Sequence, residues 1–329
     1  MSLVAPFPYF GGKRRIASLV WSALGDPGGY LEPFAGSAAV LLARPCFTGL
    51  RVETINDADG WLVNAWRSIQ LSPDKVAQHC EWPVTEIDYH ARLAWLQSRR
   101  DADLVAWLEG DPEHHDPKAA AWWLYVSACG IGNVWKPGPW HIVGEYLRKT
   151  STDSSGVMAT LPHLSTGGQG ILRKLPHLGD GGKGYQSIKV SHLYEYMQTL
   201  ATRLKNVRIV CGDWKRITTA SVVRAKRGGD GSLGIFLDPP YFTSGDLYGY
   251  VDKDVCAEVQ QWCARETSGL RVILCGYEND HDALMDVGWT KMDGIAGSGS
   301  GYKVDPTAGK RERLWFSPSC LGAQMELKL

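Results

Sequence analysis

The segment LGIFLDPPYF, residues 233–242, joins five apolar residues to an acid, two prolines and two aromatic residues. The apolar run does not alternate with polar residues, which is typical of a strand covered on both faces in a parallel sheet. An Asp-Pro pair is also a common way to open a surface turn, and that interpretation stays open at this point. A rigid acid at the end of a buried strand nevertheless indicates a functional site at Asp238.

Four other apolar runs are built in the same way, with polar residues directly after each run. The runs lie at residues 30–31, 51–55, 207–211 and 270–275, and their endings are Glu32-Pro33, Asn56-Asp57, Gly212-Asp213 and Gly276-Tyr277-Glu278. Helical stretches at 38–43, 61–70 and 254–268 alternate with the runs, and two more strands are expected at 289–295 and 313–317. This alternation predicts an α/β fold with a doubly wound, mostly parallel sheet, whose ligands bind at the carboxyl ends of the strands.

Length and composition set the class of protein. The chain has 329 residues, 44% of them hydrophobic, and can bury one large core or two smaller ones. It shows neither a leader pattern nor an apolar run of about 18 residues, so we expect a cytoplasmic protein without a membrane partner. The formal net charge is zero, so a nucleic-acid partner would need a local basic surface.

The cysteines and histidines argue against disulfides and metal sites. The eight cysteines are scattered, without a CxxC pair, and are expected to be reduced, buried thiols. The nine histidines form no spaced ligand pair, and the adjacent His114-His115 lies in an acidic loop. We therefore expect no metal.

Residues 72–204 differ from the parts on either side. Helical stretches at 119–128 and 191–204 flank an irregular part with two similar segments, LPHLSTGGQGI at 161–171 and LPHLGDGGKGY at 175–185. Basic residues outnumber acids in the irregular part, which suits a polyanionic partner and fits a solvated loop equally well. We expect one domain made of residues 1–71 and 205–329, interrupted by an inserted region of residues 72–204.

Four sequence blocks in a fixed order carry a family resemblance. They are PFPYFGGKRRI at 6–16, YLEPFAGSAAVLL at 30–42, INDADGWLVNAWR at 55–67 and LDPPYF at 237–242. Together they resemble the Dam-type, alpha-group N6-adenine DNA methyltransferases, over residues 6–70 and 205–317. The resemblance implies a seven-stranded sheet of the S-adenosylmethionine-dependent methyltransferase type, with an inserted helical and loop-rich target-recognition domain.

The same resemblance implies an activity and its partners. The enzyme would transfer a methyl group from S-adenosylmethionine to the exocyclic N6 of an adenine that is flipped out of double-stranded DNA. It would need no obligate protein partner, and a bacterium, a phage or a mobile element would encode it.

The resemblance places a cofactor site around the strand ends. The residues that match the family's motifs are Tyr9, Gly12, Lys13, Glu32, Pro33, Phe34, Ala35, Gly36, Ser37, Asn56, Asp57, Asp213, Trp214 and Asp238. Gly36 would let the backbone approach the amino acid part of the cofactor, and the next helix would offer amides to its carboxylate. Asp57 would accept both ribose hydroxyls, and Asp213 and Trp214 would bracket the adenine. Asp57 could instead cap the helix near Trp61, and that alternative stays open.

The LDPPYF block implies the catalytic residues Asp238, Pro239, Pro240 and Tyr241. The Asp238 carboxylate and the Pro239 carbonyl would each accept a hydrogen bond from the target amino group. Both bonds strengthen as positive charge grows on nitrogen. The prolines fix the direction of the carbonyl, and Tyr241 would stack on the flipped base.

The DNA-contacting part of the family is matched only in outline, by AAWWLYVSACGIGNVWKPGPWHI at 120–142. The usual arginine after the Gly/Asn turn is missing, and Lys136 is the candidate substitute. The expected nucleic-acid-binding residues are Asn133, Lys136, Arg173, Lys174 and Lys183. Three alternatives remain: N4 of cytosine as the acceptor, adenine N6 in single-stranded DNA or RNA, and a non-catalytic DNA-binding member. Asp rather than Ser before Pro-Pro-Tyr favours adenine.

Overall fold

The computed structural model describes residues 3–7, 9, 13–45, 51–81, 86–99, 104–129, 140–143, 146–149, 190–240, 253–292 and 311–322. The chain forms two units, which we describe separately. The first unit consists of Met1–Ala5, Tyr9–Val63 and Lys205–Leu329, and the second of Pro6–Pro8 and Asn64–Leu204. Helix α3, Gly60–Leu71, begins in the first unit and continues into the second.

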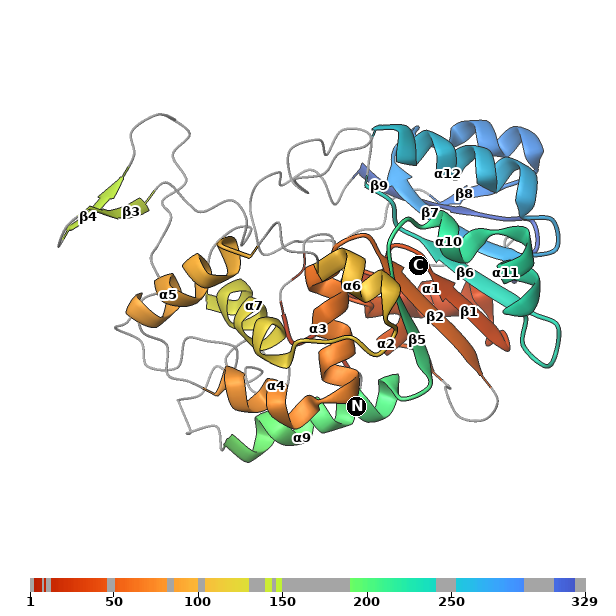
Figure 1. Ribbon diagram of the computed structural model, residues 1–329. Coiled ribbons are helices and arrows are strands. Elements are labelled where there is room, and N and C mark those ends of the chain that lie inside the picture. The colour runs from red at the N-terminus through yellow and green to blue at the C-terminus, as the bar shows by residue number, and fades with distance from the viewer. Residues whose placement is uncertain are drawn as a thin grey trace, which may run out of the picture. The chain divides into compact units, whose positions relative to one another are not determined.

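A seven-stranded sheet forms the centre of the first unit, with the strand order β5-β2-β1-β6-β7-β9-β8 (Figure 1). The strands are β1 (Gly29–Glu32), β2 (Val52–Asp57), β5 (Val207–Cys211), β6 (Leu233–Leu237), β7 (Arg271–Tyr277), β8 (Thr290–Met292) and β9 (Glu312–Phe316). The first five in chain order pair in parallel, and β9 is antiparallel to both β7 and β8. The predicted α/β class with a mostly parallel sheet is therefore confirmed, and the reversed β9 makes the sheet mixed.

Helices pack on both faces of this sheet. The helical elements of the unit are η1 (Lys13–Arg15), α1 (Ala17–Leu24), α2 (Ala39–Leu42), α10 (Lys215–Thr218), α11 (Ala220–Ala225), α12 (Lys253–Glu266) and η2 (Asp282–Val287). All five residues of β6 are buried, as the LGIFL pattern predicts. Leu233, Ile235 and Leu237 share one core with residues of α11 and α12. Gly234 faces the other way, toward Leu24 of α1.

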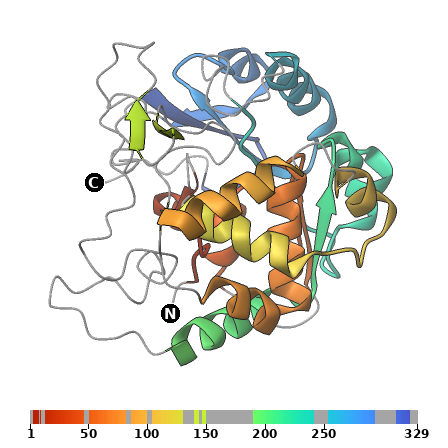
Figure 2. The same cartoon turned by 60° about the vertical axis from the view of Figure 1, so that its left-hand side comes forward.

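The second unit is mainly helical in its described part (Figure 2). Its elements are α4 (Pro73–Cys80), α5 (Glu86–Gln97), α6 (Leu104–Gly110), α7 (Pro117–Cys129), α9 (Val190–Leu204) and a two-stranded antiparallel sheet of β3 (Trp140–Val143) and β4 (Tyr146–Lys149). Helix α7 packs against α4 and α5, and α4 also packs against α9. Phe7 contacts Trp66 and Trp123, with ring centroids 5.3 and 5.1 Å apart.

Polar side chains of α3 tie the helices of the second unit together. The buried Arg67 donates from Nη1 to the carbonyls of Leu108 and Asp111, at 2.9 and 3.0 Å. Asn64 exchanges two hydrogen bonds with the backbone of Asp116, whose carboxylate accepts from the amide of Ala119 in α7. These bonds satisfy backbone groups at helix ends, where the helix itself supplies no partner.

Two expectations about the whole chain can be compared with the described residues. None of their helices is both long enough and apolar enough to cross a membrane. Six of the cysteines are buried thiols outside any disulfide, as predicted: Cys80, Cys211, Cys256, Cys263, Cys275 and Cys320.

Candidate functional site

Polar residues from four strand ends collect along one edge of the sheet. Strand β1 pairs in parallel with β2 on one side and β6 on the other, and β2 pairs with β5. The chain runs from β1 to β2 and β5 on one side of β1 and then crosses to β6 and β7 on the other, and such a switch in direction opens a crevice at the carboxyl ends. The residues that end or directly follow these four strands are those that the sequence singles out.

Asn56 holds three of these strand ends together. Its Nδ2 donates to the carbonyls of Pro33 and Gly212, at 3.0 and 2.9 Å. Its own carbonyl accepts from the amide of Ala35 at 2.9 Å. Asn56 is 2% exposed, so these bonds lie inside the protein and fix the loops after β1 and β5. We therefore interpret Asn56 as a residue that positions the site.

The loop after β1 is shaped by a buried acid. Oε2 of Glu32 accepts from the Tyr30 hydroxyl at 3.0 Å and from the amide of Leu41 in α2 at 3.2 Å. Burial, with the Glu32 carboxylate beside it, raises the pKa of Tyr30 well above its usual range. Glu32 is 2% exposed, so its carboxylate anchors the loop from within the protein. Helix α2 spans four residues, shorter than the predicted 38–43, and Glu32 already uses one of its amides.

Gly36 occupies a crowded place that only glycine fits. Its φ is 47°, and a Cβ atom there would lie 2.5 Å from the ring of Tyr9. Its amide donates to Oδ2 of Asp57 at 2.9 Å. The loop after β1 is thus joined to the end of β2, and the ring of Tyr9 lies against it at Gly36. Phe34, half-buried in the same loop, packs against the core cluster of the unit.

Asp57 and Asp59 have separate tasks. Oδ1 of Asp59 accepts from the amides of Trp61 and Leu62, at 2.9 and 3.4 Å, and so caps α3. The alternative that Asp57 is the cap is wrong, because the chain needs two more residues before the helix begins. The oxygens of Asp57 accept from the amides of Gly36 and Asp59 instead. Burial raises the pKa of Asp57 to about 6, against the opposing effect of these amides.

The end of β5 supplies an acid and an aromatic residue. Asp213 is exposed, and its Oδ1 accepts from the amide of Lys215 at 2.7 Å. Trp214 is 4% exposed, and its ring centroid lies 6.0 Å from that of Phe34. The indole Nε1 of Trp214 is buried without a hydrogen-bond partner among the described residues. An unpaired buried donor is costly, so it marks a place where a ligand acceptor would be favourable.

Asp238 lies in a cluster of three charged side chains. Nζ of Lys13 is 3.2 Å from Oδ2 of Asp238 and 3.4 Å from Oε1 of Glu312. Cys275 in β7 adjoins the cluster, and burial together with the Asp238 carboxylate raises the pKa of its thiol well above the usual range. Pro239 is buried and Pro240 half-buried directly after the acid. The Asp-Pro-Pro segment that ends β6 is therefore partly buried and ion-paired, unlike a turn exposed to solvent.

Glu312 and Cys275 are site residues that sequence reasoning missed. Glu312 pairs in register with Tyr277, the last residue of β7. Because β9 runs antiparallel, its first residue lies at the edge where the parallel strands end. The sequence does show an acid, Glu312, at the start of the last strand. Placing that acid at the site required knowledge that the strand runs antiparallel to β7.

The remaining predicted residues fall outside the described residues. They are Gly12, Tyr241, Asn133, Lys136, Arg173, Lys174 and Lys183. Among the described residues, no group of three His, Cys, Asp or Glu side chains could hold a metal ion.

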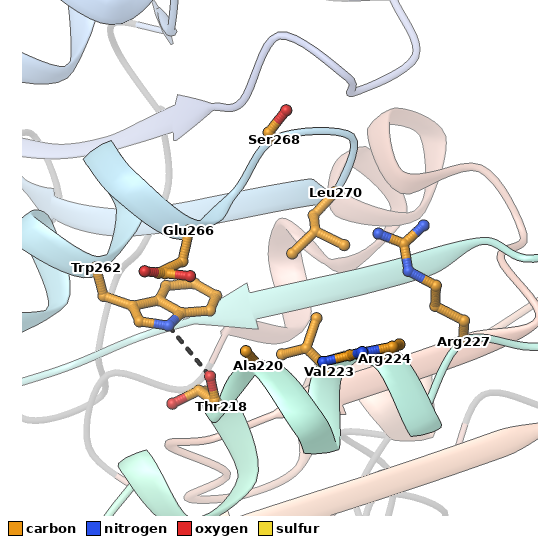
Figure 3. Close-up of a pocket in the computed structure, with 9 residues that line it drawn as sticks. All are labelled: Thr218, Ala220, Val223, Arg224, Arg227, Trp262, Glu266, Ser268 and Leu270. Atoms are coloured by element: carbon orange, nitrogen blue, oxygen red, sulfur yellow. Dashed lines mark hydrogen bonds between the residues drawn. The ribbon is translucent and has the colours of Figure 1, made fainter.

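A cavity of about 220 Å³ lies elsewhere in the first unit (Figure 3). Its lining includes Leu270, which directly precedes β7, and Val223, Arg224 and Arg227 around α11. Trp262 closes one side and donates from Nε1 to the carbonyl of Thr218 at 3.2 Å. The cavity is near the amino end of β7 and contains none of the predicted site residues, so we place the site at the opposite, carboxyl ends.

Comparison of the chain with protein-family models and with the curated proteins finds no match.

Proposed function

We propose that this protein is an S-adenosylmethionine-dependent DNA methyltransferase of the Dam type, acting on adenine N6. One observation carries the proposal: Gly36, Asp57, Trp214 and Asp238 stand at adjacent strand ends on one sheet edge. The order of the five parallel strands, with its switch point beside β1, is that of nucleotide-binding folds and is compatible with this class.

The donors and acceptors of the edge fit the chemistry of the proposed cofactor. The Asp57 oxygens accept from backbone amides, and a carboxylate has about four lone-pair sites, so it would also accept from ribose hydroxyls. The half-buried ring of Phe34, which packs against the buried Trp214, suits a purine, and the loop from Pro33 to Ser37 would hold the amino acid part. When bound, the cofactor would supply an electrophilic methyl group on a positively charged sulfur.

Asp238 and the Pro239 carbonyl would then act on the acceptor base. A neutral exocyclic amine is a weak nucleophile, because its lone pair is delocalised into the ring. Acceptors for its two N–H bonds turn the lone pair toward the methyl group and stabilise the charge that develops on nitrogen. The contact between Lys13 and Oδ2 of Asp238 restricts rotation of the carboxylate, which supports this positioning role.

The second unit is the candidate DNA-binding unit, and its described residues support a polyanionic partner. Arg99 lies 4.0 Å over the ring of Trp95, and Lys118 lies 4.5 Å over that of Trp122. The two rings meet edge to face at 4.9 Å, between α5 and α7. Surfaces that bind nucleic acid combine cations along the backbone with aromatic side chains that stack on bases, and both kinds of side chain are present here.

A test uses methyl transfer from labelled cofactor to unmethylated genomic DNA, followed by nucleoside analysis. Asp238→Ala should lower turnover by about two orders of magnitude, or ~3 kcal/mol, because it removes one transition-state acceptor. Asp238→Asn keeps an acceptor oxygen without the charge and should fall between Ala and wild type. Asp286→Ala, an exposed acid of the same unit, is the control and should be fully active.

The product decides between acceptors. N6-methyladenine supports the proposal, whereas N4-methylcytosine would move the protein to the alternative class. Full activity of Asp238→Ala would contradict the assigned role of the LDPPYF block.

A further inference from the structure

One ammonium group is shared by two carboxylates at the end of β6. Lys13 comes from η1, Asp238 follows β6, and Glu312 begins β9. The side chains of Lys13 and Glu312 are only 8% and 10% exposed, and that of Asp238 is 22% exposed. These three side chains carry one positive and two negative formal charges, which sum to −1.

Selection for fold stability alone would not favour a second carboxylate, that of Glu312, beside Asp238. Burial of an additional carboxylate beside Asp238 costs solvation energy, and the carboxylates repel each other. A glutamine at position 312 would accept the same hydrogen bond from Lys13 without that cost. The raised pKa of Cys275 keeps its thiol neutral, so it adds no charge. The charge of Glu312 therefore calls for a role beyond holding the strand in place.

We propose that Glu312 is a positioning residue that sets the net charge of the acceptor site. It binds Lys13 and offsets its positive charge, so that Asp238 acts on the reacting centre as an effective anion. The inference rests on the function proposed above. Without Glu312, the pair of Lys13 and Asp238 would be neutral and would stabilise a nearby cation less.

The chemistry of methyl transfer requires such a site. The target nitrogen attacks the methyl carbon while the carbon–sulfur bond breaks and its electrons remain on sulfur. Positive charge passes from sulfur to nitrogen, which then loses a proton to water. A cation is therefore present beside the cluster before, during and after transfer, and a net charge of −1 favours it throughout.

The test compares binding of S-adenosylmethionine, which has a positive sulfur, with that of S-adenosylhomocysteine, which has a neutral one. Titration calorimetry gives the ratio of the two affinities, in which the contacts common to both compounds cancel. Glu312→Gln should lower this ratio about fivefold, as expected for one charge several ångströms away in a partly screened site. Glu278→Gln is the control and should leave the ratio unchanged, because Glu278 is 52% exposed and pairs with Arg313.

A double variant separates charge from structure. Lys13→Gln combined with Glu312→Gln restores a net charge of −1 through Asp238 alone, so the ratio should return toward the wild-type value. Recovery supports a role through charge, and a double variant no better than Glu312→Gln contradicts it. Thermal unfolding of both variants checks that they fold.

The outcomes distinguish this inference from the proposed function. If the wild-type protein binds neither compound, the proposed function fails. If it binds both and Glu312→Gln keeps the wild-type ratio, only the role of Glu312 is wrong.

Discussion

At the scale of single residues, Asp57 and Asp59 lie two positions apart in the sequence and have different structural roles. Asp57 connects the end of β2 to the loop at Gly36, whereas Asp59 accepts from the first amides of α3. Both carboxyls have pKa values raised by burial, so both are held in surroundings that disfavour charge. Their proximity in sequence makes them a matched pair for mutation.

Asp57→Ala should lower the affinity for S-adenosylmethionine at least tenfold, because it removes the acceptor for the ribose hydroxyls; one such lost bond to a charged group costs ~1.5–3 kcal/mol. Asp59→Ala should keep the affinity and lower the free energy of unfolding by ~1 kcal/mol, the usual cost of a lost helix cap. Calorimetry and urea unfolding at pH 8, well above the Asp57 pKa of about 6, measure both quantities. Equal loss of affinity in the two variants would contradict the separate roles.

At the scale of elements, the packing of α12 and η2 against β7 and β9 buries a histidine. His281 is 0% exposed and lies edge-on to Trp315 at 5.0 Å, with Cys256 and Gln260 of α12 beside its ring. A Cβ atom on Gly276 would lie 2.8 Å from the imidazole, so glycine in β7 makes room for the ring. Burial lowers the pKa of His281 to about 4, against the opposing effects of the Cys275 backbone and of Asp282.

This histidine should make the first unit sensitive to acid. The unfolded chain binds the proton more readily than the folded one between the usual pKa of 6.5 and about 4, so stability is lost as the pH falls through this window. Between pH 7.5 and pH 5 the loss is about 2 kcal/mol by linkage. His281→Gln does not titrate, so its deficit in unfolding free energy relative to wild type should shrink by that amount at pH 5.

Urea unfolding of the two proteins at both pH values measures the change. Because Asp57 and the other carboxyls are present in both proteins, their own pH dependence cancels in the comparison. A deficit that stays constant between pH 7.5 and pH 5 would show that His281 is not held neutral.

At the scale of the whole molecule, the two units suggest a division of work between cofactor and DNA. The four strand ends with the proposed cofactor and acceptor residues belong to the first unit, and the expected DNA-contacting residues belong to the second. The two activities should therefore be separable by changes confined to residues 64–204.

Deletion of residues 160–184 should weaken DNA binding and leave S-adenosylmethionine affinity unchanged, because these residues belong to the second unit. A second variant keeps the chain length and replaces only the basic residues Arg173, Lys174 and Lys183 by glutamine, which separates loss of charge from loss of the segment. Each lost phosphate contact should lower the slope of log affinity against log salt by about one. DNA affinity and site choice unchanged by the deletion would assign DNA binding to other residues.

Local patterns in the sequence determined much of this protein. Apolar runs, unbroken in β6 and interrupted by one arginine each in β5 and β7, identified these strands, and the polar residues after them marked the edge of the sheet. The α/β class and the buried thiols followed from the same patterns. Each of these features depends on residues that are close together in the sequence. A strand that is buried on both faces consists mainly of apolar residues, so its burial can be predicted from its sequence.

Only the tertiary structure decided how distant charges meet. It assigned the cap of α3 to Asp59, turned Glu32 inward toward Tyr30 and Leu41, and brought Glu312 to Lys13 across nearly the whole length of the chain. For Glu312 the physical reason is the direction of β9, because an antiparallel strand puts its first residue, and a parallel strand its last, at the edge where the site lies. A sequence pattern predicts a strand without its direction, so the charge balance around Asp238 became visible only in the folded chain.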